Sequence, residues 1–341
     1  MSALITGDWH LSSNPRDDYR HDFITNELPK LVQRHKPDQL IVLGDLTDQK
    51  DCHRAELVQD IAAHIWHLSR YCRVIILRGN HDCINPDAPF FGFFRYFDNV
   101  DFVFDSKIED IAGLGLCCFL AHTRDYKKSW QRFNFDPFKR DPEAGFIFCH
   151  NTFEGAITAA KGHPLKGIPT TALPPKAHVI SGDVHYPQQL DQVTYVGAPY
   201  TVTFGDVYSP RILLINGYKN KVTVNSIPVT GVRKRTIEVD DPDNLPPAQA
   251  RAGDLLKIRV HLKVEDYVKW GEIQTNIRKW GESTGAIVCQ IQPVKTSRRM
   301  RLKKSGASIS RTDLQLLHSF GERRALASPF MKTGEWLMKK V

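Results

Sequence analysis

Short apolar runs alternate with amphipathic segments over the first two-thirds of the chain. The runs are rich in β-branched residues, as is typical of buried strands, and cover residues 3–6, 39–43, 74–77, 117–120, 146–149 and 178–180. Between them, residues 22–35 and 54–71 have helical periodicity, and the second segment places Leu57, Ile61, Ile65 and Leu68 on one face. Strands that alternate with helices predict an α/β sheet stacked between helices.

The pattern changes after about residue 190. Runs at 194–196, 212–215 and 222–224 lack long intervening helices and predict an antiparallel continuation. The polar, proline-rich segment 240–247 predicts a linker or domain edge. A strand at 255–260, a helix at 265–280 and a strand at 286–291 then predict a small αβ unit, and a weakly amphipathic helix is expected over 313–327. The core of this αβ unit is expected to include one face of the helix at 265–280, formed by Trp270, Ile273, Ile277 and Trp280.

Composition excludes several classes of protein. A length of 341 residues suggests about two domains, and 41% hydrophobic residues exclude an intrinsically disordered chain. No apolar run approaches the roughly 18 residues of a membrane span, and the first residues do not form a signal peptide. The seven cysteines form no CxxC pair, which predicts reduced thiols in a cytoplasmic protein.

The positive charge is concentrated at the C-terminal end. Residues 295–341 hold 12 basic and 3 acidic residues, a net charge of +9, whereas the whole chain has +8. The rest of the chain is therefore close to neutral. This asymmetry favours a polyanionic partner or an interaction tail, and a solvated helical face is an equally good explanation.

Acidic, amide and imidazole side chains directly follow five of the strand-like runs. Ligands bind at the carboxyl ends of the strands in an open α/β sheet, so we expect these side chains to converge: Asp8, His10, Asp45, Asn80, His150, Asp183 and His185. Oxygen and imidazole donors without a thiolate suit Mn²⁺ or Fe²⁺ best. The set is large enough for two ions about 3.5–4 Å apart, the usual clamp for displacement at phosphorus. The glycines beside these residues are expected to let the chain turn sharply off each strand.

These motifs resemble, in order, the series found in calcineurin-like metallophosphoesterases. The matching residues are Asp8-x-His10, Gly44-Asp45, Gly79-Asn80-His81-Asp82, His150 and Gly182-Asp183-x-His185. Within that superfamily the chain most resembles the SbcD-type nuclease subunits of bacteria and phages, on segments 121–125, 149–155, 185–188 and 195–199. The resemblance implies a β-sandwich flanked by helices over residues 1–228, a small αβ capping domain over 229–294 and a basic tail over 295–341.

The resemblance also implies a role for each residue. Asp45 would bridge two ions, the first held by Asp8, His10 and His185 and the second by Asn80, His150 and Asp183. A hydroxide between the ions would attack the phosphodiester in line. His81 would stabilise or protonate the leaving oxygen, and Asp82 would orient His81. Asp183 departs from the family pattern, which usually has histidine there, and its negative charge favours a harder metal ion.

Several further residues are candidates for contacts with DNA. His122 and Arg124 follow a strand and would line the cleft or form a plain loop. A basic loop interleaved with aromatic residues would grip a phosphate backbone or simply be solvated; it contains Lys127, Lys128, Trp130, Arg132, Phe133, Lys139 and Arg140. In the tail, Arg298, Arg299 and Arg301 would contact DNA or a protein partner. The aromatic cluster at 90–97 is expected to be mostly core, with a dimer interface as the alternative that the resemblance allows.

The leading functional hypothesis is a Mn²⁺-dependent DNA nuclease subunit, with Mg²⁺ or Fe²⁺ as alternative ions. The resemblance implies exonuclease action on duplex ends, endonuclease action on single strands or hairpins, and a homodimer in the cytoplasm of a bacterium or phage-infected cell, with no membrane partner. It also implies an SbcC-type coiled-coil ATPase, docked on residues 313–327. Two alternatives stay open: a phosphatase or phosphodiesterase for small or protein substrates, and a non-catalytic scaffold.

Overall fold

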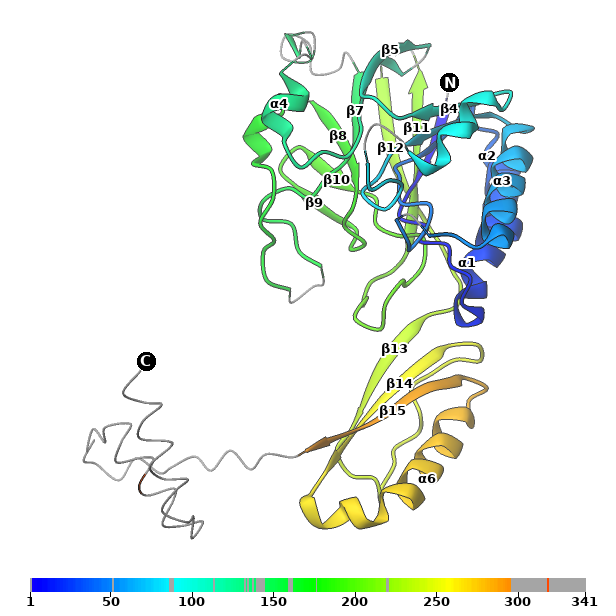
Figure 1. Ribbon diagram of the computed structural model, residues 1–341, viewed down its shortest axis with the longest axis vertical. Coiled ribbons are helices and arrows are strands. Elements are labelled where there is room, and N and C mark those ends of the chain that lie inside the picture. The colour runs from blue at the N-terminus through cyan, green and yellow to red at the C-terminus, as the bar shows by residue number, and fades with distance from the viewer. Residues whose placement is uncertain are drawn as a thin grey trace. The chain divides into compact units, whose positions relative to one another are not determined.

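The computed structural model describes most of the chain (Figure 1). The described residues are 2–50, 52–85, 89–112, 114–131, 133, 135, 136, 138, 145–158, 162–175, 177–218, 221–295 and 318. By compactness the chain divides into residues 1–295 and 296–341. Apart from His318, the expected tail helix at 313–327 lies outside the described residues, as do Arg298, Arg299 and Arg301. None of the helices in the described ranges is long and apolar enough to cross a membrane.

The first unit contains two six-stranded sheets. The first sheet has the order β12-β11-β1-β2-β3-β4, with β1 to β4 parallel and β11 and β12 antiparallel. Its strands are β1 (Ser2–Thr6), β2 (Gln39–Val42), β3 (Arg73–Leu77), β4 (Val100–Val103), β11 (Arg211–Tyr218) and β12 (Lys221–Pro228). The antiparallel continuation predicted at 212–215 and 222–224 is therefore confirmed.

The second sheet has the order β5-β6-β7-β8-β10-β9. Its strands are β5 (Lys107–Ile111), β6 (Gly115–Leu120), β7 (Gly145–His150), β8 (His178–Gly182), β9 (Gln188–Leu190) and β10 (Val193–Tyr195). Strands β6, β7, β8 and β10 are parallel, and the two edge strands are antiparallel. The antiparallel continuation expected at 194–196 is present only in part, because β10 pairs in parallel with β8 and antiparallel with β9.

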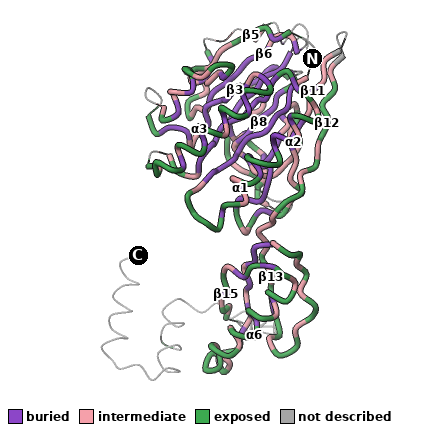
Figure 2. The backbone as a smooth tube through the Cα atoms, turned by 90° about the vertical axis from the view of Figure 1, so that its right-hand side faces the viewer, coloured by how far each residue is buried: buried purple, intermediate pink, exposed green. Residues whose placement is uncertain are grey.

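The two sheets pack face to face around a shared core. Side chains alternate along each strand, so Ile41 and Ile75 point between the sheets, where they meet Phe119 and Phe148 from the second sheet. The intervening residues point to the other face of the first sheet, against its helices. Figure 2 shows the buried strands at the centre of this part of the chain. The β-sandwich flanked by helices that the resemblance implies is confirmed, whereas periodicity alone suggests a single sheet.

Helices cover the outer face of the first sheet. They are α1 (Asp18–Asp22), the π-helical η2 (Phe23–Glu27), α2 (Leu28–His35), α3 (Ala55–Ser69) and the 3₁₀ segment η3 (Phe90–Tyr96). The predicted helix at 22–35 thus begins earlier and has three parts. All four apolar residues predicted to share a face of α3 are buried. Phe91 and Phe94 of η3 are buried, as expected of core, whereas Tyr96 is exposed. Short elements complete this part: η1 (Pro15–Asp17), α4 (Tyr126–Trp130) and η4 (Thr170–Ala172).

A smaller three-stranded sheet follows. Its strands β13 (Lys234–Val239), β14 (Leu255–Leu262) and β15 (Ile287–Lys295) are parallel, and η5 (Val264–Lys269) and α6 (Trp270–Glu282) connect the last two. Ile277 is buried, and the other three predicted core residues are partly buried and pack against the same core. The segment at 240–247 is a linker rather than a domain edge, because it connects β13 to β14 within one sheet. The domain division at residue 228 stays a prediction.

Candidate metal centre

Five strand ends, three from the first sheet and two from the second, carry the polar side chains to one place. Strands β1, β2 and β3 run parallel and end together, as do β7 and β8. The loops after β1 and β2 are joined by backbone hydrogen bonds, from Asp8 N–H to Gly44 C=O (3.0 Å) and from His10 N–H to Asp45 C=O (2.9 Å). The predicted convergence is therefore present, but two facing sheets create it rather than one.

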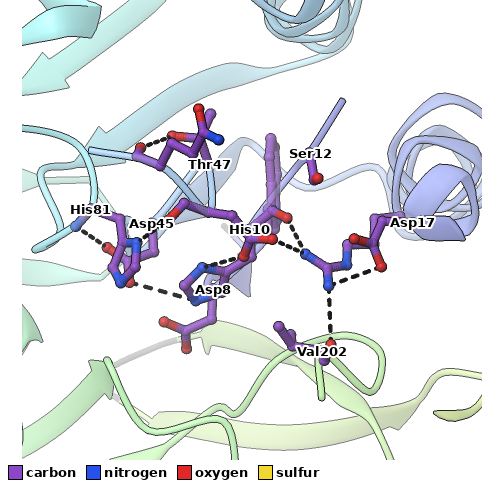
Figure 3. Close-up of polar contacts among 12 residues, drawn as sticks. Asp8, His10, Ser12, Asp17, Asp45, Thr47, His81 and Val202 are labelled. Carbon is purple, nitrogen blue, oxygen red and sulfur yellow. Dashed lines mark hydrogen bonds and ion pairs between the residues drawn. The ribbon is translucent and has the colours of Figure 1, made fainter. Parts of the chain in front are cut away.

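Asp45 faces several of the candidate ligands, and Figure 3 shows it between His10 and His81. Its Oδ1 is 3.3 Å from His150 Nε2, and its Oδ2 is 3.6 Å from His10 Nε2. The side chains of all three residues are at most 5% exposed. One buried carboxylate thus faces two imidazole groups that come from different sheets.

The remaining candidate ligands surround this centre. His185 Nε2 is 3.0 Å from His10 Nε2, and Asp183 Oδ1 is 3.7 Å from His150 Nε2. The Asp183 N–H donates to Asp8 Oδ1 over 3.0 Å, which ties the end of β8 to the end of β1. Ligand atoms about 2.1 Å from one ion and at right angles to each other are about 3.0 Å apart. The spacing of the two histidine nitrogens suits neighbouring ligands of a single ion.

Buried polar atoms without partners support the same conclusion. Asp8 Oδ2 and Asn80 Oδ1 are buried and have no hydrogen-bond partner among the described residues. Such atoms are costly unless something satisfies them. Two groups have the spacing of metal ligands, one with His10, Asp45 and His81 and the other with Asp8, Asp45 and His150. Both groups contain Asp45, so the donor set fits two divalent cations that share one carboxylate.

The backbone of the centre is strained at the candidate ligands themselves. Asp8, His10, Asp45 and Asp183 have φ angles of 53°, 45°, 55° and 78°. Few residues other than glycine adopt this left-handed region, and such strain is concentrated at functional sites. The expectation that the adjacent glycines would make the sharp turns holds only for Gly44, with φ of 96°.

The charges of the centre depend on one another. Burial raises the pKa of Asp45, but the neighbouring His150 imidazole outweighs it, with help from other histidines, and the pKa is lowered. Burial alone would lower the pKa of His150, yet Asp45 and other carboxylates hold it well above its usual value. Burial raises the pKa of Asp8. In the absence of cations the carboxylates are thus balanced by a protonated histidine, and a metal ion would have to displace that proton.

His81 and Asp82 do not interact in the way expected. The Asp82 carboxylate is buried and accepts backbone N–H bonds from Gly79 (2.6 Å), Asp45 (2.8 Å) and Leu46 (2.9 Å). The prediction that Asp82 orients His81 is wrong, because its oxygens are used to join the loops after β2 and β3. His81 Nδ1 instead donates to the backbone C=O of Asp48 over 2.6 Å.

Three supporting residues were missed in the sequence. Asp48 Oδ1 is 3.2 Å from His10 Nδ1, and Asp206 Oδ2 is 3.6 Å from His185 Nδ1, so these two candidate ligands each have a carboxylate behind the ring, whereas His150 Nδ1 faces the C=O of Leu43. Such carboxylates fix the tautomer and orientation of metal-binding histidines. Arg20 is 2% exposed, and its guanidinium donates hydrogen bonds to Asp48 and to the C=O of His10. Asp48 follows Asp45 closely and could have been suspected, whereas nothing in the sequence marks Arg20 or Asp206.

The candidate DNA-contacting residues differ in their distance from the metal centre and in whether the structure describes them. The half-buried His122 lies beside the centre, with its Nδ1 donating to the C=O of His150 over 3.1 Å. Arg124, Lys127 and Lys128 are exposed. The other basic residues of that predicted loop, Arg132, Lys139 and Arg140, lie outside the described residues. Among these side chains, His122 alone is joined to the centre by a contact in the described structure.

Comparison with known proteins bears on the same region. A family model described as calcineurin-like phosphoesterase matches residues 1–187, more than half of the chain. None of the curated proteins matches the chain significantly. Among solved structures, vacuolar protein sorting 29 from Cryptosporidium parvum is similar, with 11% identity, a TM-score of 0.28, and coverage of 67% of this chain and 97% of that one. The family match includes every candidate ligand, from Asp8 to His185.

Proposed function

The chain belongs to the calcineurin-like phosphoesterase family, and from this premise we propose that it is a metal-dependent nuclease that hydrolyses DNA phosphodiesters. The observation that carries the hydrolytic part is the buried cluster around Asp45, with histidines of two sheets within 3.6 Å of its carboxylate. Membership of the family supports metal-dependent phosphoester hydrolysis. DNA as the substrate, and Mn²⁺ as the ion, are the finer part of the proposal.

The residues present fit two divalent cations, which when bound would activate a water molecule and polarise the phosphate. Asp45 would be shared by both, with His10 and His185 as ligands of one and His150 and Asp183 as ligands of the other. The resemblance assigns Asp8 to the first ion, whereas the spacing here groups its carboxylate with the ligand atoms of Asp45 and His150. Asn80, between Gly79 and His81, would offer its partnerless Oδ1.

The neighbouring side chains have separate tasks. Because a carbonyl oxygen can only accept, the contact with the C=O of Asp48 keeps the proton on His81 Nδ1. Nε2 is then the ring atom that can exchange a proton with a leaving oxygen. Asp82 holds the loop that carries His81 against the loop that carries Asp45.

Three features support DNA as the substrate. The net charge of +9 over residues 295–341 suits a polyanion. The αβ unit of β13, β14 and β15 adds a second part to the phosphoesterase domain. The sequence around His122, His150 and His185 resembles that of SbcD-type nuclease subunits. The same resemblance underlies our proposals of a homodimer and of an SbcC-type ATPase partner that docks on the tail.

The proposal is tested with end-labelled linear duplex DNA and Mn²⁺. We expect degradation by the intact chain, and a loss of at least about a hundredfold in Asp8→Ala and in His81→Ala. His261→Ala, in the αβ unit, is the matched control and should retain full activity. If DNA stays intact while a small phosphodiester is turned over, the enzyme is a phosphodiesterase of another class. If the protein purified without chelator carries no metal and cleaves neither, it is a scaffold.

The partner proposal needs its own experiment. A tagged SbcC-type ATPase should capture the full chain and lose it when residues 296–341 are deleted. Unchanged capture of the deletion variant would contradict docking through the tail. Retention of small-ester hydrolysis by that variant would show that the phosphoesterase domain is intact.

A further inference from the structure

Behind the candidate metal centre, charged side chains, all buried except that of Asp48, form a continuous chain of contacts that ends in the αβ unit. We propose that Lys234, the first residue of β13, is a positioning residue that holds His10 and His185 in place through this chain. The inference rests on the proposed function in so far as both histidines are taken to bind one cation. Figure 3 shows Asp17 and Val202 on one side of His10, with Asp45 and His81 on the other.

The first branch leads to His10. Lys234 Nζ is 2.6 Å from Asp17 Oδ1, which is 3.1 Å from Arg20 Nη2. Arg20 Nη1 donates to Asp48 Oδ2 over 2.9 Å and also to the C=O of His10. Asp48 Oδ1 then contacts His10 Nδ1 at 3.2 Å. The chain therefore holds the strained backbone of His10 through a hydrogen bond and places a carboxylate beside its ring.

The second branch leads to His185. The C=O of Val202 accepts hydrogen bonds from Lys234 Nζ (3.1 Å) and Arg20 Nη2 (3.0 Å). The N–H of the same residue donates to Asp206 Oδ2 over 2.8 Å, and that oxygen is 3.6 Å from His185 Nδ1. Both branches therefore begin at Lys234 and end on the nitrogen of a candidate ligand that faces away from the centre.

The balance of charge explains why Lys234 matters. The side chains of Asp17, Arg20 and Lys234 are 7%, 3% and 11% exposed, so water screens them little. Arg20 is shared between two carboxylates, those of Asp17 and Asp48. Lys234 neutralises Asp17 and so leaves Arg20 available to Asp48 and His10. Without Lys234, Asp17 would be a buried and only partly compensated charge that draws Arg20 toward itself.

The same lysine is fixed to the small sheet. It pairs with Leu255 in the register of β13 and β14, and its backbone N–H donates to Thr201 Oγ1 over 2.7 Å. A single residue thus belongs to the αβ unit and supports the candidate centre. A displacement of β13 away from Asp17 would therefore change the contacts that support His10 and His185.

The test measures Mn²⁺ binding by the full chain in the absence of DNA. Electron paramagnetic resonance reports the concentration of free Mn²⁺ at each step of the titration. Lys234→Met should weaken one of the two binding steps by about three- to tenfold, less than the 10–100-fold typical when a direct supporting partner is lost. Lys234→Arg, which keeps the charge, should bind within about twofold of the parent. Arg233→Met is the matched control, because Arg233 precedes Lys234 but pairs with Asp254 inside the αβ unit.

A double-mutant cycle separates positioning from a general loss of stability. In the Asp48→Asn background the first branch is already broken, so Lys234→Met should have less than half of its effect on the logarithm of Mn²⁺ affinity. Additive effects, or equal weakening by Arg233→Met, would overturn the inference. Unchanged Mn²⁺ affinity in Lys234→Met would overturn it as well. If the parent binds Mn²⁺ but does not cleave DNA, the proposed nuclease function fails while the positioning role is still decided by these affinities.

Discussion

Asp82 offers the sharpest test of how the candidate centre is held together. Its Oδ2 accepts two N–H groups, from Gly79 and Asp45, and its Oδ1 accepts the N–H of Leu46. In Asp82→Asn the amide oxygen can replace Oδ2, but the NH₂ group then faces the Leu46 N–H. The substitution therefore removes one hydrogen bond and opposes two donors in a fully buried place.

A buried donor left without an acceptor costs about 1–3 kcal/mol, so we expect the free energy of unfolding to fall by about that amount. The assay is urea unfolding of the metal-free protein, with the exposed Asp240→Asn as a control that should leave the midpoint unchanged. Because the carboxylate joins the loops of Asp45 and His81, Mn²⁺ binding should weaken in the same variant.

The alternative role, orientation of His81, predicts a different pattern. It requires a loss of catalytic rate without a loss of stability, and no further effect of Asp82→Asn once His81 is alanine. The hydrogen bonds predict that the destabilisation persists unchanged in the His81→Ala background. Equal stability of Asp82→Asn and the parent, with a rate defect that disappears in the double variant, would refute our reasoning.

Three further predictions concern the same centre. Asp183→Ala should weaken one Mn²⁺ step by at least about tenfold, as measured by calorimetry, and unchanged binding would remove Asp183 from the ligand set. Because the pKa of His150 is raised in the folded protein, its protonation stabilises the metal-free fold fully below the unfolded pKa of about 6.5, and this stabilisation is lost as pH rises through the folded pKa. Mn²⁺ affinity should rise over the same pH interval. Calorimetry in buffers of different ionisation enthalpy should then show that Mn²⁺ binding releases a proton. Gly44→Ala should lower the free energy of unfolding by about 2–4 kcal/mol, because residue 44 has a φ of 96° and the new Cβ would lie 2.7 Å from the Gly79 backbone. Gly231→Ala is the control: its Cβ would have nothing within 4 Å, so the variant should unfold like the parent.

Much of the fold could be predicted because burial of apolar runs is a local signal. Strands at 39–42 and 73–77 and the helix at 55–69 are within two residues of their expected bounds. The strands at 107–111 and 188–190 were missed, because both lie at a sheet edge and contain few apolar residues. The pairing of two sheets could not be predicted from periodicity, since a strand buried on both faces has the same pattern under a helix as under another sheet.

Part of the candidate site could be predicted from the sequence, and part could not. Residues at or just beyond the end of a strand, such as Asp8 and His150, could be found because strand ends converge. Arg20 and Asp206 could not, because they act through contacts with residues far away in sequence, such as the hydrogen bond of Arg20 to Val202, 182 residues away. The true partners of Asp82 were hidden for another reason: they are backbone N–H groups, and no side-chain pattern records them.

Asp183 changes the charge that a substrate would meet. With Asp8, Asp45 and Asp183 as the carboxylate ligands, two divalent cations would leave the centre with a net charge near +1, whereas histidine at position 183 would leave +2. A phosphodiester carries one negative charge, so this centre would attract it less strongly. The basic excess of residues 295–341 lies elsewhere in the chain and would restore the attraction for a long polyanion but not for a small ester. The departure at Asp183 therefore favours a polymeric substrate, and it predicts that Asp183→His would improve hydrolysis of small phosphodiesters more than that of DNA.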